Sequence, residues 1–285
     1  MKFLTIFFLS LVSVIGQVPP MMMQDYLVAV KPKEFDPVFR QLTINSNNFW
    51  FSMAASPNGN IFVATHGTPP DGKGIFVLSN GIGDFQAISP GSGFNDYYGM
   101  AVTATNNLYV AVYGSTTEKV LYDGATNWSA INQEKRNWRG MGASPNGDIY
   151  AAVYGGYIYK QTGGAGNFGQ VGPYSMLTWV SIAGAPNTNI YACTINNIYM
   201  QAYGSSGFTS LTQAPSAGSW YGIAAASNGD IYACAGTGDI YKQTGGTGNF
   251  VGLSQTNRIY TGICVAPNGD VYVCVNRGDI YVRRN

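Results

Sequence analysis

One unit of sequence recurs six times and limits the folds that this chain can adopt. Each copy carries an aromatic residue followed by a short apolar stretch: WFSMAAS, YGMAVTA, WRGMGAS, WVSIAGA, YGIAAAS and YTGICVA. We align the copies on Trp50, Tyr98, Trp138, Trp179, Trp220 and Tyr260, which stand 40 to 48 residues apart. A fixed period of this length indicates a repeat architecture in which each copy is one supersecondary unit.

Each unit divides into four short strands. The copies NGDIYAAVYGGYIYKQTGGAGNF (146–168) and NGDIYACAGTGDIYKQTGGTGNF (228–250) show the plan. Asn-Gly flanked by apolar residues predicts a two-residue hairpin loop with positive φ at both positions. The third strand follows a second turn, and an aromatic residue begins the fourth. These aromatic residues are Phe39, Phe85, Trp128, Phe168, Phe208 and Phe250. Four antiparallel strands about every 40 residues are typical of a β-propeller blade.

The two ends of the chain complement each other. The C-terminal unit holds only three strands, whereas the N-terminal segment supplies a fourth-strand aromatic without a first strand before it. We therefore expect an all-β, six-bladed propeller of four-stranded antiparallel blades. Residues 26–49 complete the last blade and close the ring, which also protects a sheet edge. The expected domain is 17–285, with units starting near residues 50, 98, 138, 179, 220 and 260.

The first 16 residues, MKFLTIFFLSLVSVIG, read as a secretory signal peptide. One lysine precedes an apolar run, and small residues suited to cleavage follow. The run is too short for a membrane span, so we expect a secreted, extracellular protein without membrane insertion. A net charge of +1, with only 10% charged residues, gives no electrostatic basis for binding nucleic acid.

The four cysteines are expected to be buried free thiols. Three of them, Cys193, Cys234 and Cys274, occupy one repeat position that holds Ala152 in another copy. A position that accepts alanine or cysteine is small and buried. Counting from an Asn-Gly loop places Cys264 and Cys274 on opposite faces of their hairpin, which disfavours a disulfide.

Groups suited to catalysis are scarce. The single histidine, His66, stands in an insertion of the first unit and has no second histidine for a metal site or a catalytic triad. We expect it in a solvated loop. Asp148, Asp230 and Asp270 follow hairpin turns, where aspartate is common. The alternative is a carboxylate ring that binds a cation, but Asn60 and Asn189 interrupt it. No catalytic residue, metal or cofactor is expected.

The repeated aromatic residues allow two interpretations. A large residue at the start of the innermost strand most often fills the space between blades. Alternatively, it forms a platform in the cleft between blades on which a sugar ring stacks. Polar residues that vary between copies stand beside these aromatics. The candidate ligand-binding residues are Trp50, Trp138, Trp179, Trp220, Tyr260, Arg136, Asn137 and Arg258.

Two further polar features remain open. Lys160-Gln161 and Lys242-Gln243 recur in third strands, where strand alternation turns at least one of each pair to solvent. They indicate either a repeated function or a recent duplication. Asn127-Trp128-Ser129 is a sequon at a predicted turn, which makes Asn127 a candidate for N-glycosylation in a secreted glycoprotein.

The combination of an opening aromatic, GIA, NGDIYA and GDIYKQ resembles the tectonin-type repeat, and the broad plan is similar to that of tachylectin-type propeller lectins. The resemblance covers residues 26–285 and rests on short strand motifs; Tyr98 and Tyr260 depart from the tectonin tryptophan. It implies a lectin that recognises glycans at several sites.

The sequence and this resemblance together favour a secreted, non-catalytic, carbohydrate-binding propeller whose partners are glycans or glycoproteins. Several similar clefts on one rigid body would raise weak single-site binding by avidity. The first alternative is an extracellular propeller module for protein–protein interaction or structure. The second is a propeller hydrolase or lyase.

Overall fold

The computed structural model describes residues 38–42, 48–66, 74–88, 96–113, 115–121, 127–171, 176–211 and 219–285. All of these residues except Asn285 belong to the compact unit Asp36–Arg284. The expected signal peptide, residues 1–16, lies outside the described residues. Within the described part, no helix is long and apolar enough to cross a membrane.

The strands recur in the order that the repeat predicts. The innermost strands are β2 (Trp50–Ala55), β6 (Tyr97–Val102), β10 (Trp138–Ala143), β14 (Leu177–Gly184), β18 (Trp220–Ala225) and β22 (Tyr260–Val265). The second strands are β3 (Ile61–Thr65), β7 (Leu108–Val112), β11 (Ile149–Gly156), β15 (Ile190–Thr194), β19 (Ile231–Ala235) and β23 (Val271–Val275).

The outer strands are shorter than the inner ones except in the second unit, where the two outer strands are the longer pair. The third strands are β4 (Ile75–Leu78), β8 (Ser115–Leu121), β12 (Ile158–Gln161), β16 (Ile198–Gln201), β20 (Ile240–Gln243) and β24 (Ile280–Arg283). The outermost strands are β5 (Gln86–Ala87), β9 (Ser129–Arg136), β13 (Gly169–Gln170), β17 (Phe208–Ser210), β21 (Val251–Gly252) and β1 (Arg40–Leu42). Single 3₁₀ turns, η1 (Ser79–Gly81), η2 (Thr162–Gly164) and η3 (Thr244–Gly246), precede three of the outermost strands.

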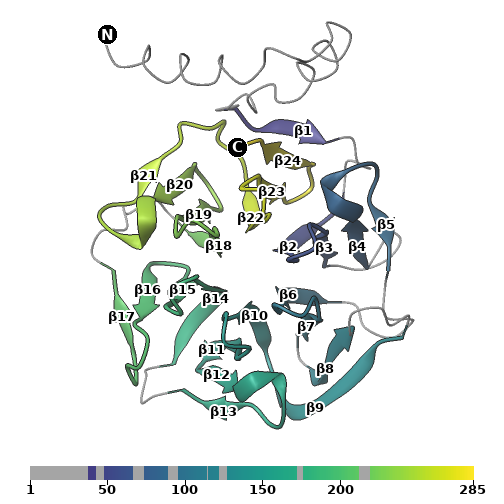
Figure 1. Ribbon diagram of the computed structural model, residues 1–285, viewed down its shortest axis with the longest axis vertical. Coiled ribbons are helices and arrows are strands. Elements are labelled where there is room, and N and C mark those ends of the chain that lie inside the picture. Colours follow the sequence, from purple (N-terminus) through teal and green to yellow (C-terminus); the bar gives the residue numbers. More distant parts are fainter. Residues whose placement is uncertain are drawn as a thin grey trace, which may run out of the picture. The chain divides into compact units, whose positions relative to one another are not determined.

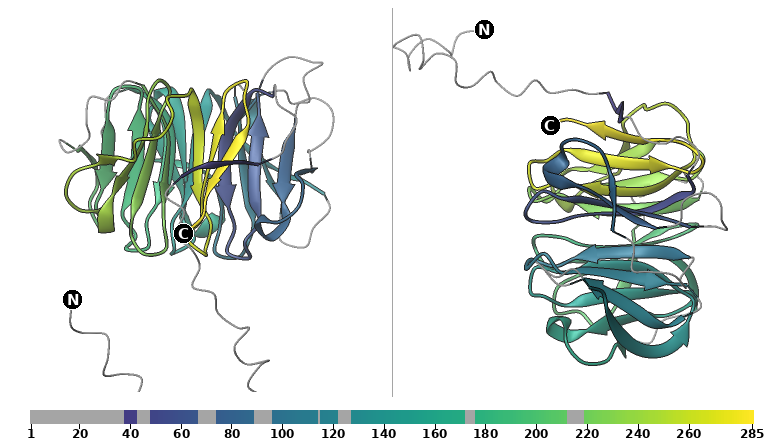
Figure 2. Two further views of the ribbon diagram at one scale, coloured as in Figure 1. Left: turned by 90° about the horizontal axis from the view of Figure 1, so that it is seen from above. Right: turned by 90° about the vertical axis from the view of Figure 1, so that its right-hand side faces the viewer.

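The sheets stand around a central axis, which confirms an all-β propeller (Figure 1). The innermost strands are neighbours in the order β2, β6, β10, β14, β18 and β22, and β22 returns to β2. Among the described residues, four sheets have four strands each and one sheet has eight. The larger sheet forms because β11 continues past its own unit and pairs with β14. Seen edge-on, the strands run between the two faces of the ring (Figure 2).

The ring closes as expected. Strand β1 pairs with β24, and Gln41 stands opposite Tyr281. The first described strand therefore supplies the outermost strand of the sheet that contains the last three strands of the chain (Figure 1). This pairing covers an edge of β24 that would otherwise present free backbone groups.

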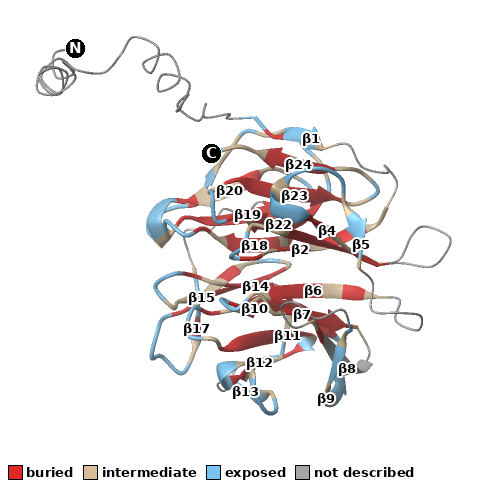
Figure 3. Cartoon of the chain, turned by 45° about the vertical axis from the view of Figure 1, so that its right-hand side comes forward, coloured by how far each residue is buried: buried red, intermediate tan, exposed pale blue. Residues whose placement is uncertain are grey.

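The hydrophobic core lies between neighbouring units. Buried residues concentrate on the inner strands, while the outermost strands and turns are exposed (Figure 3). One cluster, for example, joins Trp220 and Ile231 to Tyr191 and Ile198 of the preceding unit. Because every unit covers the apolar face of the next, the ring buries an apolar layer on both faces of each sheet.

The hairpin after each innermost strand differs from the expected two-residue loop. In the first unit, Gly59 has a φ of +89°, whereas Asn58 is not among the residues with positive φ. The Gly59 N–H bonds to the carbonyl of Ser56 at 2.9 Å, and Ser56 N–H bonds to the carbonyl of Asn60 at 2.9 Å. The loop therefore has three residues, with only its final glycine in the left-handed region. The expectation of positive φ at both Asn and Gly is wrong.

The extra loop residue shifts the hairpin register by one and corrects the expected placement of the cysteines. Cys264 pairs with Tyr272, while Cys274 pairs with Gly262. Cys264 and Cys274 therefore lie on the same face of the hairpin and share one apolar cluster. The expectation of four buried free thiols is nevertheless confirmed.

We expect native protein at pH 8 to resist thiol labelling. All four thiols are buried, and burial raises the pKa of Cys193 and Cys274 to about 12. Thiolate, rather than thiol, reacts with disulfide reagents. A colorimetric titration should therefore detect almost no thiol in native protein and four per chain after denaturation under non-reducing conditions. Two titratable thiols after denaturation would instead indicate a disulfide and contradict this assignment.

Candidate functional site

The sequence-predicted aromatic candidates lie in the core. Trp50, Trp138, Trp179, Trp220 and Tyr260 are each no more than 1% exposed. Each of the four tryptophan rings packs on an aromatic ring of the third strand in its own unit; the ring centroids of Trp138 and Tyr159, for example, are 5.3 Å apart. No ring face remains for a ligand, because stacking requires an accessible face. This placement corrects the expectation that these five residues form binding platforms.

The predicted polar candidates are engaged near their own units. The Arg136 guanidinium stacks on Tyr159 at 4.5 Å and pairs with Glu134. Arg258 stacks on Tyr281 at 4.3 Å. The backbone carbonyl of Asn137 accepts a hydrogen bond from Tyr154 N–H at 2.9 Å. These contacts fix the backbone just before the innermost strands. They do not bring Arg136, Asn137 and Arg258 together around one ligand.

The structure exposes the candidate glycosylation site, Asn127, but buries the recurrent glutamines, Gln161 and Gln243. Asn127 is exposed just before β9, and its modification stays a prediction. Gln161 and Gln243 are 3% exposed, and their side-chain amides donate to the carbonyls of Gly166 at 2.6 Å and Gly248 at 2.7 Å. The recurrent glutamines therefore fix the turn that leads to the outermost strand.

The recurrent lysines neutralise the aspartates that follow the hairpin loops. Lys242 Nζ lies 2.7 Å from Asp230 Oδ2, and the other carboxylate oxygen accepts a bond from Gly245 N–H at 2.8 Å. Burial raises the pKa of Asp230, but hydrogen bonds from Lys242, Gly245 and Asn228 together lower it below its usual value of 3.8. The interaction thus ties the inner hairpin to the third strand and to the following 3₁₀ turn.

The same arrangement argues against the carboxylate-ring alternative. Asp148 is 3.2 Å from Lys160, and Asp270 is 2.6 Å from Arg284, so each carboxylate has its own cation. Within the residues that the structure describes, no group of three or more histidine, cysteine, aspartate or glutamate residues is placed to hold a metal ion.

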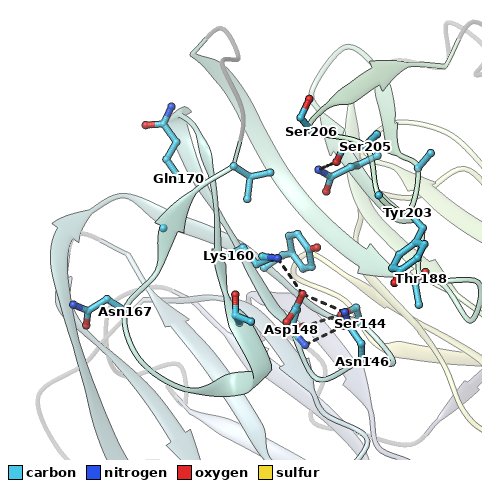
Figure 4. A pocket seen from close by; sticks show the side chains of 17 residues that line it. Ser144, Asn146, Asp148, Lys160, Asn167, Gln170, Thr188, Tyr203, Ser205 and Ser206 are labelled. Atoms are coloured by element: carbon cyan, nitrogen blue, oxygen red, sulfur yellow. Dashed lines mark hydrogen bonds and ion pairs between the residues drawn. The ribbon is translucent and has the colours of Figure 1, made fainter.

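A cleft of about 780 Å³ lies between the third and fourth units (Figure 4). Asp148 and Lys160 form part of its floor, and Tyr203 and Ser205 line the opposite side. Asp148 also bonds to Asn146, so its carboxylate is already committed to the repeat interaction. The volume suits a small molecule, but these groups do not form an acid–base pair available for catalysis.

Another set of residues meets at the axis because every innermost strand carries a β-bulge. The register with the second strand shifts immediately after the opening aromatic in all six units. In the second unit that aromatic is Tyr97, which is 1% exposed, so the expected start at Tyr98 is wrong by one residue. The residues at the shift are Phe51, Tyr98, Arg139, Val180, Tyr221 and Thr261. Bulges redirect side chains and often occur beside active sites.

Arg139 supplies the positive charge at this end of the axis. Its guanidinium carbon lies 4.5 Å from the ring centre of Tyr154, 5.4 Å from Phe51 and 5.6 Å from Tyr98. Tyr221 lies farther away, at 6.0 Å. Phe51, Tyr98 and Tyr221 come from three different innermost strands, so residues distant in sequence converge on this one cation.

His66 adjoins this group through Tyr98. The ring centres of His66 and Tyr98 are 5.1 Å apart, and Phe51 packs edge-on against the imidazole at 5.3 Å. His66 Nδ1 faces Asp96 Oδ1 at 3.6 Å, while the backbone of His66 bonds to Phe49. The His66 side chain is only 32% exposed. The expectation of a solvated loop histidine is wrong, because strand-end pairing and aromatic packing hold it.

The environment of Tyr98 favours a neutral phenol. Burial raises its pKa above 10.0, Asp96 raises it further, and Arg139 opposes both. The hydroxyl therefore keeps its proton near neutral pH and can donate a hydrogen bond. His66, Asp96, Tyr98 and Arg139 together offer a proton carrier, a carboxylate close to it, a neutral donor and a cation.

Sequence reasoning missed this group although one signal was present. Arg139 is the single charged residue in the six innermost strands. Such a strand is packed on both sides, so an unexplained charge within it marks a functional candidate. His66 and Asp96 give no comparable signal, since they are separated by residues of the first unit and meet only because the first and second units pack side by side.

No family profile and no curated protein matches this sequence. The fold is similar to solved propellers. A virginiamycin B lyase from Staphylococcus aureus has 12% identity and a TM-score of 0.63, covering 87% of this chain and 99% of its own. A gluconolactonase from Xanthomonas campestris has 10% identity and a TM-score of 0.69, covering 86% and 89%. A chain of a mitotic checkpoint complex has 12% identity and a TM-score of 0.63, covering 90% and 95%.

These neighbours correct the functional expectation from sequence. Two of the three are enzymes, and none is named as a tectonin-type lectin. The expectation of a non-catalytic, carbohydrate-binding lectin is therefore contradicted. At identities of 10% to 12%, the likeness itself establishes the propeller fold.

Proposed function

We propose that this protein is an enzyme whose active site lies at the end of the axis occupied by Arg139. The observation that carries the proposal is the His66–Asp96 contact at 3.6 Å beside that cation. Two structural neighbours, the lyase and the gluconolactonase, support elimination and lactone hydrolysis as the reaction classes to test.

His66 would transfer the proton in either reaction. Asp96 Oδ1 lies 3.6 Å from Nδ1, too far for a hydrogen bond, and packing against Phe51 and Tyr98 holds the imidazole. Nε2 is the other nitrogen for proton exchange. Elimination removes a proton next to an electron-withdrawing group, forms a carbon–carbon double bond and breaks the bond to a leaving group on the next carbon. Lactone hydrolysis adds activated water to the carbonyl carbon and breaks the ring's acyl C–O bond, which gives a hydroxy acid. One positioned general base can serve both chemistries.

Arg139 would stabilise the negative charge that develops in these reactions. Its guanidinium presents planar donors and is partly shielded from water by Phe51, Tyr154 and Tyr221. Shielding strengthens the attraction between a fixed cation and an enolate or oxyanion. The neutral Tyr98 hydroxyl supplies a further hydrogen-bond donor near the same position.

Replacing His66 with glutamine should lower kcat/KM about 100-fold, because general acid–base catalysis commonly contributes at least that factor. Lactone hydrolysis would be followed by acid release from gluconolactone. Elimination would be followed by absorbance of the new conjugated double bond in a panel of esters with an acidic α-proton. Asp84→Asn, at an exposed carboxylate away from the site, should retain wild-type activity.

Thermal unfolding and circular dichroism would show that each variant is folded. Equal turnover by the wild type and His66→Gln would overturn the assigned role. Failure of folded wild-type protein to turn over either substrate class would overturn the proposed reactions.

A further inference from the structure

The Arg139 guanidinium lacks the carboxylate partner that two other ring-stacked arginines, Arg136 and Arg284, possess. Within the described part of the chain, it has no hydrogen-bonded or carboxylate partner, and its buried Nε has no acceptor. By contrast, Arg136 combines stacking on Tyr159 with a carboxylate, and Arg284 combines a ring contact with Asp270. Arg139 has the rings but not the acceptor.

This contrast indicates the charge of the missing partner. A shielded cation is unfavourable unless an opposite charge and hydrogen-bond acceptors compensate for lost water. Asp96, the nearby carboxylate of the proposed site, already faces His66. A ligand carboxylate could accept two parallel hydrogen bonds from the guanidinium, which is the geometry that arginine recognises best.

The surrounding aromatic side chains indicate the shape of that ligand. Phe51, Tyr98, Tyr154 and Tyr221 surround the cation at 4.5–6.0 Å between the guanidinium carbon and each ring centre. The axial cavity that all six innermost strands line, at and beyond the bulges, has a volume of only about 30 Å³. A cavity of this size has room for only about two or three water molecules, so an aromatic ligand cannot descend the axis.

We infer that the site binds a small, flat aromatic carboxylate, which lies across the end of the axis with its carboxylate on Arg139 and its ring against the partly exposed tyrosine side chains. The inference rests on the active site proposed above and names a ligand class that the Arg139 end of this site holds. A flat ring offers stacking surface without needing depth, and the anion satisfies the unpaired guanidinium. Neither a neutral aromatic nor an aliphatic carboxylate supplies both interactions.

Calorimetric titration with benzoate would test the ligand class without requiring turnover. Benzoate should bind the wild type at least about tenfold more tightly than either benzyl alcohol or cyclohexanecarboxylate, a difference of about 1.4 kcal/mol in binding free energy. Benzyl alcohol lacks the charge, and cyclohexanecarboxylate lacks the flat ring. Arg139→Gln should weaken benzoate binding by at least about tenfold, because it removes the charge-assisted hydrogen bonds.

Two matched variants separate recognition from folding and from general charge. Arg136→Gln removes a ring-stacked arginine outside this group and should leave benzoate affinity unchanged. Arg139→Lys retains the charge but loses the planar donor pair, so its affinity should lie between those of the wild type and Arg139→Gln. Circular dichroism would establish that each variant used in the comparison is folded.

The outcomes distinguish this inference from the proposed catalysis. Benzoate binding that depends on Arg139, without turnover, would support the ligand class and overturn the enzyme assignment. Turnover that depends on His66, without benzoate binding, would support the enzyme and overturn the ligand class. Equal affinity of the wild type and folded Arg139→Gln for benzoate would also overturn the inference.

Discussion

Replacing Gly99 with alanine lowers the free energy of unfolding by about 3 kcal/mol, the upper part of the usual range for overpacking. An added Cβ would stand 2.4 Å from the Arg139 carbonyl oxygen and 2.8 Å from the Met141 nitrogen. Both atoms belong to the backbone of β10, so a side-chain rotation cannot relieve the clash. The second and third units would have to move apart where their innermost strands meet.

Chemical denaturation at neutral pH would measure this loss. Gly169→Ala is the matched control because an added Cβ there meets only the Lys160 carbonyl oxygen, at 4.0 Å. The control should change stability by less than about 0.5 kcal/mol, as surface substitutions usually do. A Gly99→Ala protein as stable as the control would contradict the close strand approach. The variant also tests the site, because displacement of β10 moves Arg139.

The repeat made the architecture predictable because each unit needs its neighbours to bury its apolar faces. The opening aromatics, the hairpin loops and the fourth-strand aromatics recur at fixed places, and β1 pairs with β24 as the incomplete ends require. The sequence prediction was wrong by one residue at two places where the repeat period does not determine the backbone conformation. The Pro-Asn-Gly loop and the adjacent tyrosines Tyr97 and Tyr98 are the two cases.

The candidate site was less predictable because it depends on departures from the repeat. The aromatic residues that recur most regularly are buried, while the residue after each of them varies and comes to the axis at a bulge. Arg139 is an exception within otherwise uncharged innermost strands. His66 reaches Asp96 only because two units pack side by side. Such contacts require the ring geometry, which no local pattern specifies.

The fourth unit shows why lysine recurs in the Lys-Gln segments of the third and fifth units, because both members of the aspartate–lysine pair are replaced there. Where the third and fifth units have Asp148/Lys160 and Asp230/Lys242, the fourth unit has Asn189 and Met200 at the same register. Asn189 Oδ1 still accepts the backbone N–H of the next turn, from Tyr203 at 3.0 Å. The cation is therefore present where the carboxylate needs it and absent where an amide replaces the carboxylate.

Replacing Lys242 with methionine should accordingly lower the free energy of unfolding by about 2 kcal/mol at pH 7. Asp230 is 7% exposed and would remain charged without its cation. The expected loss is below the range for fully buried pairs because the Lys242 side chain is 28% exposed. Adding Asp230→Asn should restore most of the loss, because the double variant reproduces Asn189 and Met200. Lys135→Met, at an exposed lysine, is the control.

The pH dependence of the free energy of unfolding distinguishes the Asp230–Lys242 ion pair from a purely packing role of the lysine side chain. The pKa of Asp230 is lowered from 3.8 on folding, so its contribution is present above that value and is lost as the pH falls through the folded pKa. The pKa of Lys242 is raised from 10.5, so its contribution is present below that value and is lost as the pH rises through the folded pKa. Denaturation between pH 2 and pH 7 should therefore show a smaller stability loss in the double variant than in the wild type. An equal acid-induced loss in both proteins, or no rescue of Lys242→Met by Asp230→Asn, would show that the recurrent lysine has another role.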